Sequence, residues 1–374
     1  MRKLIIALCL VIIFFAYVLS FKDIIFKHYN KSTYSVSNRV EDYNFDVFHT
    51  NIIEDRDNNI KILYDIRVFT LFAFLNRVGN YDAERDGEIM TPERQRLRSD
   101  ILKKLNDIDF DKVYEWRQFY EDNKDHNYLY LSYVLTLGSP PEFNHIVPKE
   151  QLDSKSAIFY LNGFNKVLSS FYKECDIEEL YFEYLEEGLF DKIDEYDMDN
   201  IKEDISDMYS YLRMIDDKSI NISIIPNSFD QHWSSYAIIF DKTLYIIDGH
   251  KAYNNGLNIH EYLHFIINPM VEKHMEKHRD NFVKVFEDNK DKELVRDNYN
   301  SVDAFVWESL IRALEHRIRI KQEPRLDFSK QEEYEASAGL VLVPYFSEQL
   351  KKYEDNDNIS NIDEFINILL REYK

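Results

Sequence analysis

Apolar positions recur at helical spacing along most of this chain. Between Ile62 and Val78 they follow the helical period and stop before Gly79, which predicts a buried helix. At Thr91–Glu93 a threonine is followed by a proline, which suits a helix cap and the first helical position. The same spacing predicts further helices, over residues 110–123, 127–137, 153–173, 176–215 with a break near Gly188, 270–287, 301–321, 330–353 and 361–373.

Strand patterns are confined to a short stretch in the second half of the chain. Residues Ile220–Ile225 alternate between apolar and polar positions, which is the period of a half-buried strand. The apolar runs Ser235–Phe240 and Thr243–Asp248 are separated by two residues and predict a hairpin. The predicted fold class is therefore mainly α with a small antiparallel β-sheet, an α+β arrangement.

The first residues have the pattern of an export segment. Two basic residues precede an uncharged apolar run of 18 residues, residues 4–21. Such a run is long for a signal peptide and short for a membrane-spanning helix. We therefore expect residues 1–21 to be a signal peptide or a membrane anchor, and the protein to be exported to the cell envelope (periplasmic or membrane-anchored) or secreted. Residues 22–215 would form a mostly helical N-terminal region, and residues 216–374 a second domain.

The composition narrows the classes of function. The chain of 374 residues has a net charge of −22, and nucleic acids are bound mainly through Lys and Arg, so nucleic-acid binding is disfavoured. With 45% hydrophobic residues the chain can build a substantial core. Of its two cysteines, Cys9 lies in the export segment and Cys175 is the other. Neither a disulfide within the processed chain nor cysteine ligation of a metal is expected.

The candidate chemistry centres on His260 and His264, which are separated by three residues in a His-Glu-x-x-His pattern. Histidines four apart lie on one face of a helix, so one metal ion can bind both imidazoles. Glu261 lies about 100° around the helix from His260 and can flank the metal without binding it. Two histidine ligands and a carboxylate that takes a proton from metal-activated water are what a zinc hydrolase requires. The alternative is two core histidines in a structural network with Glu261.

Helix and strand signals frame this motif. Residues 254–256 supply cap and turn chemistry before it, and Asn268 with Pro269 is expected to end the helix. The predicted hairpin lies immediately upstream. A sheet edge beside the helix would hold an extended peptide by strand addition.

A catalytic zinc site needs a third protein ligand and one open position. The metzincin continuation requires Gly and His where this chain has Ile267 and Met270, and thermolysin-like spacing requires a Glu where Lys284 stands. The remaining source is a Glu on a later helix. From the residues alone, Glu308 and Glu315 are both candidates.

Three pieces of the chain together resemble a known group of proteins. Residues 260–269 read His-Glu-x-x-His-x-x-x-Asn-Pro, residues 308–313 read Glu-x-x-x-Arg-Ala, and residues 339–343 are a glycine followed by apolar residues. In these features the chain is similar to a family of uncharacterised exported bacterial proteins classed as gluzincin-like HExxH zinc metalloproteases. The resemblance covers roughly residues 216–374, and less closely residues 65–98.

The resemblance implies a gluzincin-like zinc-protease core behind a helical N-terminal region. It assigns Glu261 as the base and three zinc ligands, His260, His264 and Glu308. The chain departs from thermolysin-type gluzincins at Arg312, where those proteins carry an Asp that orients a zinc-binding histidine. That orienting role would have to come from another residue, with Asp303 and Glu315 as candidates.

Hydrolysis also needs a donor for the oxyanion that forms on the substrate. His232, before the hairpin, and Tyr299, before the Glu308 helix, are candidates, with structural or surface roles as the alternative. Arg312 would orient Glu308, meet a substrate carboxylate, or form an ordinary salt bridge.

The sequence thus predicts a Zn²⁺-dependent hydrolase of peptide bonds in which metal-activated water attacks and Glu261 is the general base. Its partners would be peptide or protein substrates, with membrane anchoring through residues 4–21 as an option. One alternative is a non-catalytic envelope protein that keeps a zinc site for stability or partner binding. Another is zinc-dependent hydrolysis of a non-peptide amide or ester.

Overall fold

The computed structural model describes most of the chain from residue 49 onward: residues 49–56, 58–79, 91–123, 127–146, 161–190, 193–216, 219–230, 234–240, 242–249 and 257–373. The predicted signal peptide or anchor lies outside the described residues, as does the first part of the helix predicted over 153–173. Among the described helices, none combines the length and the apolar character needed to cross a bilayer.

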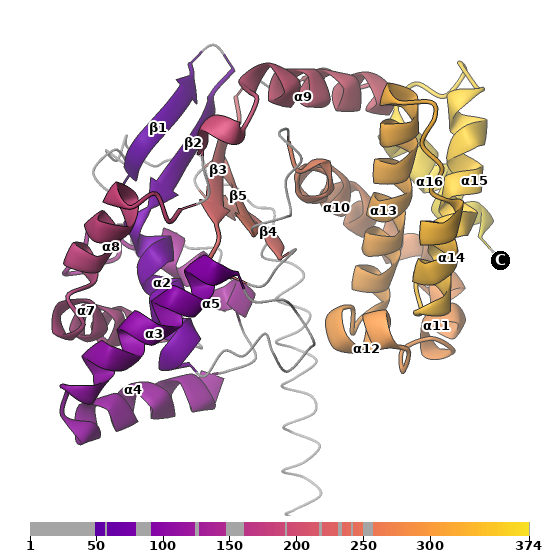
Figure 1. Cartoon of the computed structure of the whole chain (residues 1–374). Coiled ribbons are helices and arrows are strands. Elements are labelled where there is room, and N and C mark those ends of the chain that lie inside the picture. Colours follow the sequence, from indigo (N-terminus) through magenta and orange to yellow (C-terminus); the bar gives the residue numbers. More distant parts are fainter. Residues whose placement is uncertain are drawn as a thin grey trace, which may run out of the picture.

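The described strands form one five-stranded sheet, which runs from the upper left of the view towards its centre (Figure 1). Its strands, in the order β1-β2-β3-β5-β4, are β1 (His49–Asp55), β2 (Ile60–Asp65), β3 (Asn221–Asn227), β5 (Thr243–Gly249) and β4 (Ser235–Phe240). The outer pairs β1–β2 and β4–β5 are antiparallel, whereas β2–β3 and β3–β5 are parallel. The predicted β4–β5 hairpin is therefore confirmed, but the predicted antiparallel sheet is wrong because the sheet is mixed. Strand direction depends on long crossovers, which local patterns do not report.

The predicted helix from Ile62 to Val78 is in fact a strand followed by a helix. Its first residues belong to β2, and α2 (Ile66–Arg77) begins after Asp65, whose side chain accepts a hydrogen bond from the Arg67 backbone at 2.8 Å. A short apolar run fits a buried strand as well as a buried helix, so periodicity alone did not separate them. The fully buried Arg67 side chain pairs with Asp65 at 2.6 Å and donates to the backbone carbonyl of Leu137 at 2.7 Å.

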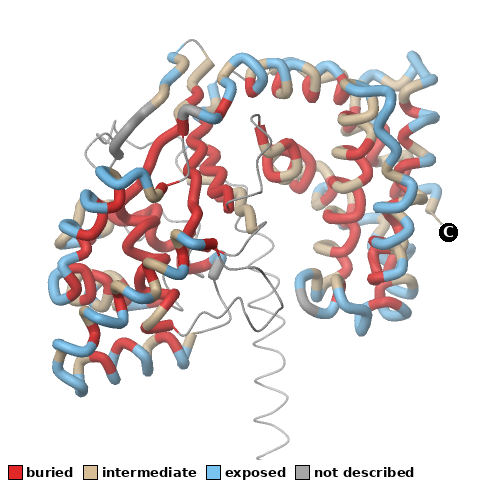
Figure 2. The backbone as a smooth tube through the Cα atoms, in the orientation of Figure 1, coloured by how far each residue is buried: buried red, intermediate tan, exposed pale blue. Residues whose placement is uncertain are grey.

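Helices of the N-terminal half surround α2, which is buried along almost its whole length (Figure 2). Those that contact it are α3 (Pro92–Asn106), α5 (Asn127–Leu135), α7 (Phe164–Glu174) and α8 (Ile177–Glu186). α4 (Phe110–Asn123) completes this group. The predicted break near Gly188 is present, because this glycine has a φ of 65° and the chain continues through a short 3₁₀ turn into α9 (Met198–Leu212).

The C-terminal half is helical, and its central element is α10 (Ile259–His278). α10 lies between the β4–β5 hairpin on one side and α13 and α16 on the other (Figure 1). The remaining helices are α11 (Asp280–Glu287), α12 (Glu293–Asn298), α13 (Val302–Gln322), α14 (Ser329–Ser337), α15 (Leu342–Glu354) and α16 (Ile362–Glu372). The predicted stop at Asn268 and Pro269 is wrong, because α10 continues through the proline. A proline removes one backbone donor, and packing on both sides keeps the helix intact.

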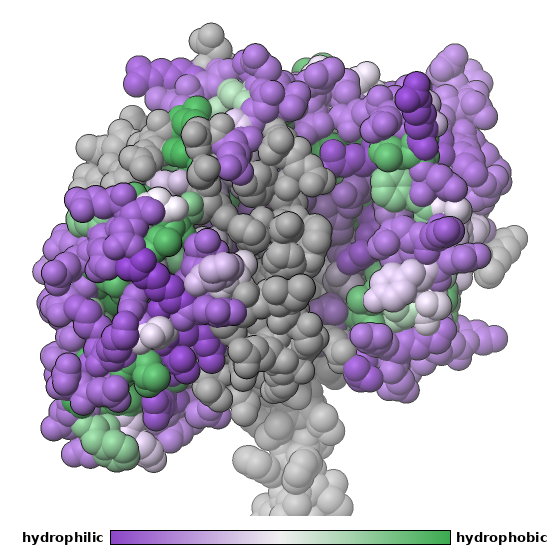
Figure 3. Space-filling model, viewed as in Figure 1, coloured by the Kyte–Doolittle hydropathy of each residue, from purple (hydrophilic) through white to green (hydrophobic). Residues whose placement is uncertain are grey.

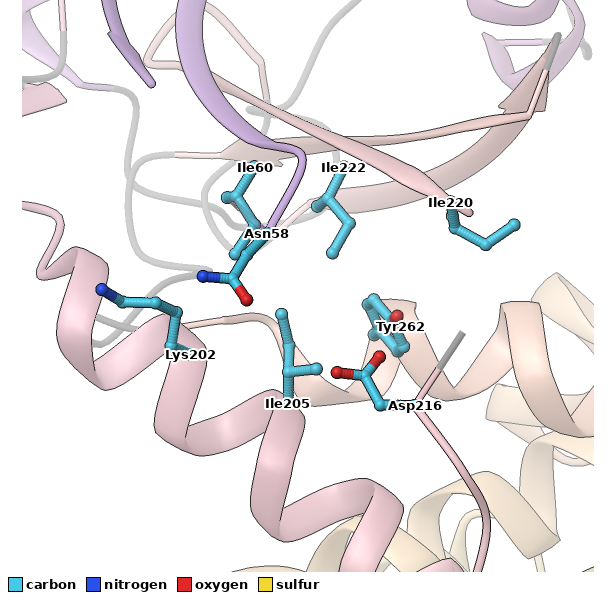
Figure 4. Close-up of a pocket in the computed structure, with 8 residues that line it drawn as sticks. All are labelled: Asn58, Ile60, Lys202, Ile205, Asp216, Ile220, Ile222 and Tyr262. Atoms are coloured by element: carbon cyan, nitrogen blue, oxygen red, sulfur yellow. The ribbon is translucent and has the colours of Figure 1, made fainter. Parts of the chain in front are cut away.

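α9 runs across the top of the molecule and joins the two halves (Figure 1). At one end Lys202 pairs with Asp55 of β1 at 3.2 Å, and beyond the other end Arg213 donates to the carbonyl oxygens of Tyr353 and Ile359. Figure 4 shows the small pocket beneath α9, where side chains from α9, the sheet and Tyr262 of α10 meet. On the face in Figure 3 most described residues are hydrophilic, and hydrophobic ones form small separate patches.

Candidate metal centre

The start of α10 is attached to the β4–β5 hairpin by Asn258. Its side-chain oxygen caps the helix by accepting from the backbone N–H of Glu261 at 3.4 Å. Its side-chain nitrogen donates to Asp248 at 3.1 Å and to the hydroxyl of Ser235 at 3.0 Å. The predicted cap over residues 254–256 lies outside the described residues. The helix that carries the motif is therefore positioned by both strands of the hairpin.

Three side chains converge on one point beside α10. The Nε2 atoms of His260 and His264 are 3.3 Å apart. Glu308 of α13 places Oε1 at 3.6 Å from the first nitrogen and Oε2 at 3.5 Å from the second. A tetrahedral zinc ion with ligand bonds of about 2.1 Å has its ligand atoms about 3.4 Å apart. The separation of the two Nε2 atoms and that of Oε2 from Nε2 of His264 are close to this value. Of the two candidate glutamates, Glu308 is the one that faces both Nε2 atoms.

The other side of each imidazole ring also has a partner. Nδ1 of His260 lies 3.2 Å from Oε2 of Glu315, and a carboxylate only accepts, so Nδ1 carries a proton and Nε2 is the nitrogen that a metal would bind in place of a second proton. Nδ1 of His264 contacts the side-chain amide of Asn268, with the oxygen at 3.4 Å and the nitrogen at 3.3 Å. Of the two residues suggested for orienting a metal-binding histidine, Glu315 is the one that contacts His260. Asp303 instead pairs with Arg279, outside the cluster.

Glu308 is held tightly in the core with only 2% of its side chain exposed. Its Oε1 accepts hydrogen bonds from the hydroxyl of Tyr299 at 2.7 Å and from Nε of Arg312 at 2.6 Å. Burial by itself raises the pKa of this carboxyl, but the Arg312 guanidinium and the two imidazoles outweigh it and lower the pKa to about 2. Glu308 is therefore an anion at neutral pH, as a metal ligand must be.

Glu261 follows His260 on α10 and points to a different side of the helix. Burial raises the pKa of its carboxyl to about 7; the charge of His260 opposes this, and those of Asp248 and Glu308 add to it. A carboxyl with a pKa near neutrality can both accept and release a proton, as a general base requires. For His260, burial disfavours the charged ring, but Glu308 and Glu315 outweigh it and raise its pKa to about 9.

The remaining predicted site residues are placed as follows. His232 lies outside the described residues. Tyr299 and Arg312 both contact Glu308, and Arg312 also donates to Glu335 at 3.0 Å. Glu335, on α14, was not found from the sequence because nothing in its local pattern links it to the motif.

Asn268 was predicted to end the helix because Pro269 follows it. It lies four residues after His264, and side chains at this spacing are neighbours on a helix, so its contact with the His264 ring could have been predicted from the sequence.

Comparisons of the chain with family models, curated proteins and solved structures found no match. Within the described residues, α10 and α13 bring His260, His264 and Glu308 together as a group that could hold a metal ion.

Proposed function

We propose that this protein is a zinc metallopeptidase. The observation that carries the proposal is the convergence of His260, His264 and Glu308, whose ligand atoms lie within 4.8 Å of one another. The two Nε2 atoms are 3.3 Å apart and Oε2 of Glu308 is 3.5 Å from Nε2 of His264, which matches two edges of a zinc coordination shell. The adjacent Glu261, with its raised pKa, supplies the base that such an enzyme needs.

The number of ligands supports a catalytic site over a structural one. A structural zinc site is closed by four protein ligands, whereas a catalytic site keeps one position open. In the part of the chain that the structure describes, the group of possible ligands has three members and no fourth His, Cys, Asp or Glu joins it. The non-catalytic alternative also gives no reason for a second carboxylate, Glu261, beside the ligands.

The residues would divide the work of peptide hydrolysis between them. When bound, zinc supplies a Lewis acid that polarises the scissile carbonyl and acidifies the attacking water. Glu261 takes one proton from that water as its oxygen bonds to the carbonyl carbon. Glu261 then passes the proton to the leaving nitrogen as the C–N bond breaks, which yields a carboxylic acid and an amine. Glu315 and Asn268 hold the two rings with Nε2 directed to the metal.

The edge of the sheet offers a place for the peptide substrate. Among the described strands β4 is the last of the sheet; it pairs with β5 on one side and packs against α10. An extended peptide would add to the outer edge of β4 through backbone hydrogen bonds, which brings it beside the metal-binding helix. Most side chains of Ser235–Phe240 are half-buried, which is expected for a strand that is covered fully only when substrate binds.

Metal content tests the proposal directly. The full-length chain, purified in a mild detergent, is expected to contain about one zinc per molecule by elemental mass spectrometry and to cleave a mixed library of quenched fluorescent peptides. His260→Ala should lose both properties, and His274→Ala, a change on the same helix outside the cluster, should lose neither. A wild-type chain that takes up no zinc on reconstitution would contradict the proposal.

A further inference from the structure

The fold contains two clusters in which a tyrosine and an arginine share one glutamate. In the first, remote from the metal centre, Tyr211 and Arg317 contact Glu354. Arg317 donates from Nε to Oε1 at 2.8 Å and from its terminal nitrogen to Oε2 at 2.5 Å, so both carboxylate oxygens are occupied. Tyr211 donates to Oε1 at 2.7 Å. This two-point contact is the usual geometry of an arginine–carboxylate pair.

At the metal centre the same residue types are arranged differently. Tyr299 donates to Oε1 of Glu308 at 2.7 Å and Arg312 donates from Nε to the same oxygen at 2.6 Å. Of its terminal nitrogens, Nη1 donates to Glu335 at 3.0 Å and Nη2 donates to the Tyr299 hydroxyl at 3.3 Å, so neither reaches Oε2 of Glu308. Among the described residues none donates a hydrogen bond to Oε2 of Glu308, which lies 3.5 Å from Nε2 of His264.

The two oxygens of Glu308 are therefore not equivalent. A carboxylate oxygen has two acceptor sites, and both sites of Oε1 are taken by Tyr299 and Arg312. Oε2 keeps its lone pairs for a metal. We propose that Tyr299, Arg312 and Glu335 are positioning residues that make Glu308 a one-oxygen metal ligand through Oε2. This inference rests on the proposed zinc site.

Glu335 has a specific part in this arrangement. It is 1% exposed, lies on α14, and accepts from both Arg312 and Gln331 at 3.0 Å. In Arg317 the terminal nitrogen that reaches the second carboxylate oxygen is Nη2, and in Arg312 the same nitrogen donates to the Tyr299 hydroxyl. Glu335 holds Nη1 on the other side of the guanidinium and so fixes the plane in which Nε meets Oε1 of Glu308 and Nη2 meets Tyr299.

In this arrangement Tyr299 and Arg312 act on the metal ligand Glu308. All three nitrogens of the Arg312 guanidinium have partners within the protein, and the Tyr299 hydroxyl is held between Glu308 and Arg312. The Tyr299 hydroxyl and the Nε–H of Arg312 are therefore committed to Glu308.

Zinc affinity of the full-length chain tests this assignment. Dissociation constants are measured by competition with a chelator of known affinity for Tyr299→Phe, Arg312→Lys and Glu335→Leu. The Lys variant keeps the charge, so its effect reports geometry. Each change should weaken zinc binding by about 10- to 100-fold, as for other groups that support metal ligands. Tyr211→Phe and Arg317→Lys make the same chemical changes in the remote cluster and should leave the constant almost unchanged.

Cobalt substitution provides a second readout. Release of Oε1 in Tyr299→Phe or Arg312→Lys should let Glu308 bind through both oxygens, which raises the coordination number and weakens the visible absorption of bound Co²⁺. Melting temperatures of the metal-free variants separate loss of fold from loss of zinc affinity. Tyr299→Phe removes a single oxygen atom, so it should disturb the fold less than the other variants. Variants that bind zinc and cobalt like wild type would overturn this inference alone, whereas absence of metal binding by wild type would overturn the proposed function with it.

Discussion

Glu315 contacts Nδ1 of His260 at 3.2 Å while Nε2 of the same ring faces Glu308. In the proposed zinc site, the two glutamates that the sequence left as candidates for one role would therefore have two different roles. Glu308 would bind the metal, and Glu315 would fix the ring that binds beside it. Loss of Glu315 should weaken the site, whereas loss of Glu308 should abolish it.

We predict that Glu315→Leu binds zinc about 10- to 100-fold more weakly than wild type, because the ring loses its hydrogen-bond acceptor. Glu315→Gln keeps an acceptor oxygen and should lose less. Chelator competition gives both values, with Glu308→Leu as the reference for a missing ligand. If Glu315→Leu held no zinc and Glu308→Leu held it normally, the two roles would be reversed.

Glu261→Gln should keep zinc and lose activity. The amide has nearly the same shape as the carboxylate but cannot accept the proton from water, so kcat/KM should fall by about 10²- to 10⁴-fold. Metal content and peptide cleavage are measured on the same preparation. Full activity in this variant would exclude Glu261 as the base.

Asn258→Ala should lower stability and also disturb the metal site. Loss of a helix cap costs about 1 kcal/mol, and here the same side chain also joins α10 to Ser235 and Asp248. Asn361→Ala removes a comparable cap from α16, where the side chain accepts from Glu364 at 3.0 Å. Denaturant unfolding should show a loss of stability for both variants, larger for Asn258→Ala, and only Asn258→Ala should weaken zinc binding. Equal zinc affinity in the two variants would contradict a positioning role for the hairpin contact.

Glu272 on α10 should make stability depend on pH. Its Oε1 is buried without a hydrogen-bond partner among the described residues, and burial, assisted by the charge of Asp303, raises its pKa from 4.5 to about 7. Between these values the folded protein holds a proton that the unfolded chain has lost, so stability falls as pH rises through this window.

Glu272→Gln removes that dependence, because the amide is neutral at every pH. Relative to wild type it should gain about 1–2 kcal/mol between pH 5 and pH 8 after allowance for solvent screening. Unfolding of the metal-free protein at the two pH values measures the gain, and the exposed Glu276 of the same helix, changed to Gln, is the control. A gain of the same size in the control would show that the effect does not come from burial.

Local patterns in the sequence predicted the β4–β5 hairpin and most of the helices, because period and cap chemistry are local properties. They also brought His260, Glu261 and His264 together, since the spacing along one helix fixes their relation. They did not separate Glu308 from Glu315. These residues are seven apart, about two helical turns, and lie on one side of α13, so only the crossing of α13 over α10 decides which one meets the histidines.

Other features depended on contacts between distant segments. The direction of β3 relative to β2 and β5 follows from long connections. The passage of α10 through Pro269 depends on packing from both sides. Glu335 reaches the site from α14 through Arg312 alone. In each case the deciding partner lies far away in the sequence.

The parallel pairing of β2 with β3 has a consequence for how the chain folds. Ile60 is aligned with Ile222, so a loop that contains the whole helical N-terminal half must close before this pair can form. Contacts between residues so far apart in sequence form slowly, because the entropy of loop closure is lost before the contact stabilises the chain. A chain cut at residue 216 would leave β3 with a bare edge open to association with other molecules. Its refolding yield should recover when the N-terminal piece is supplied separately.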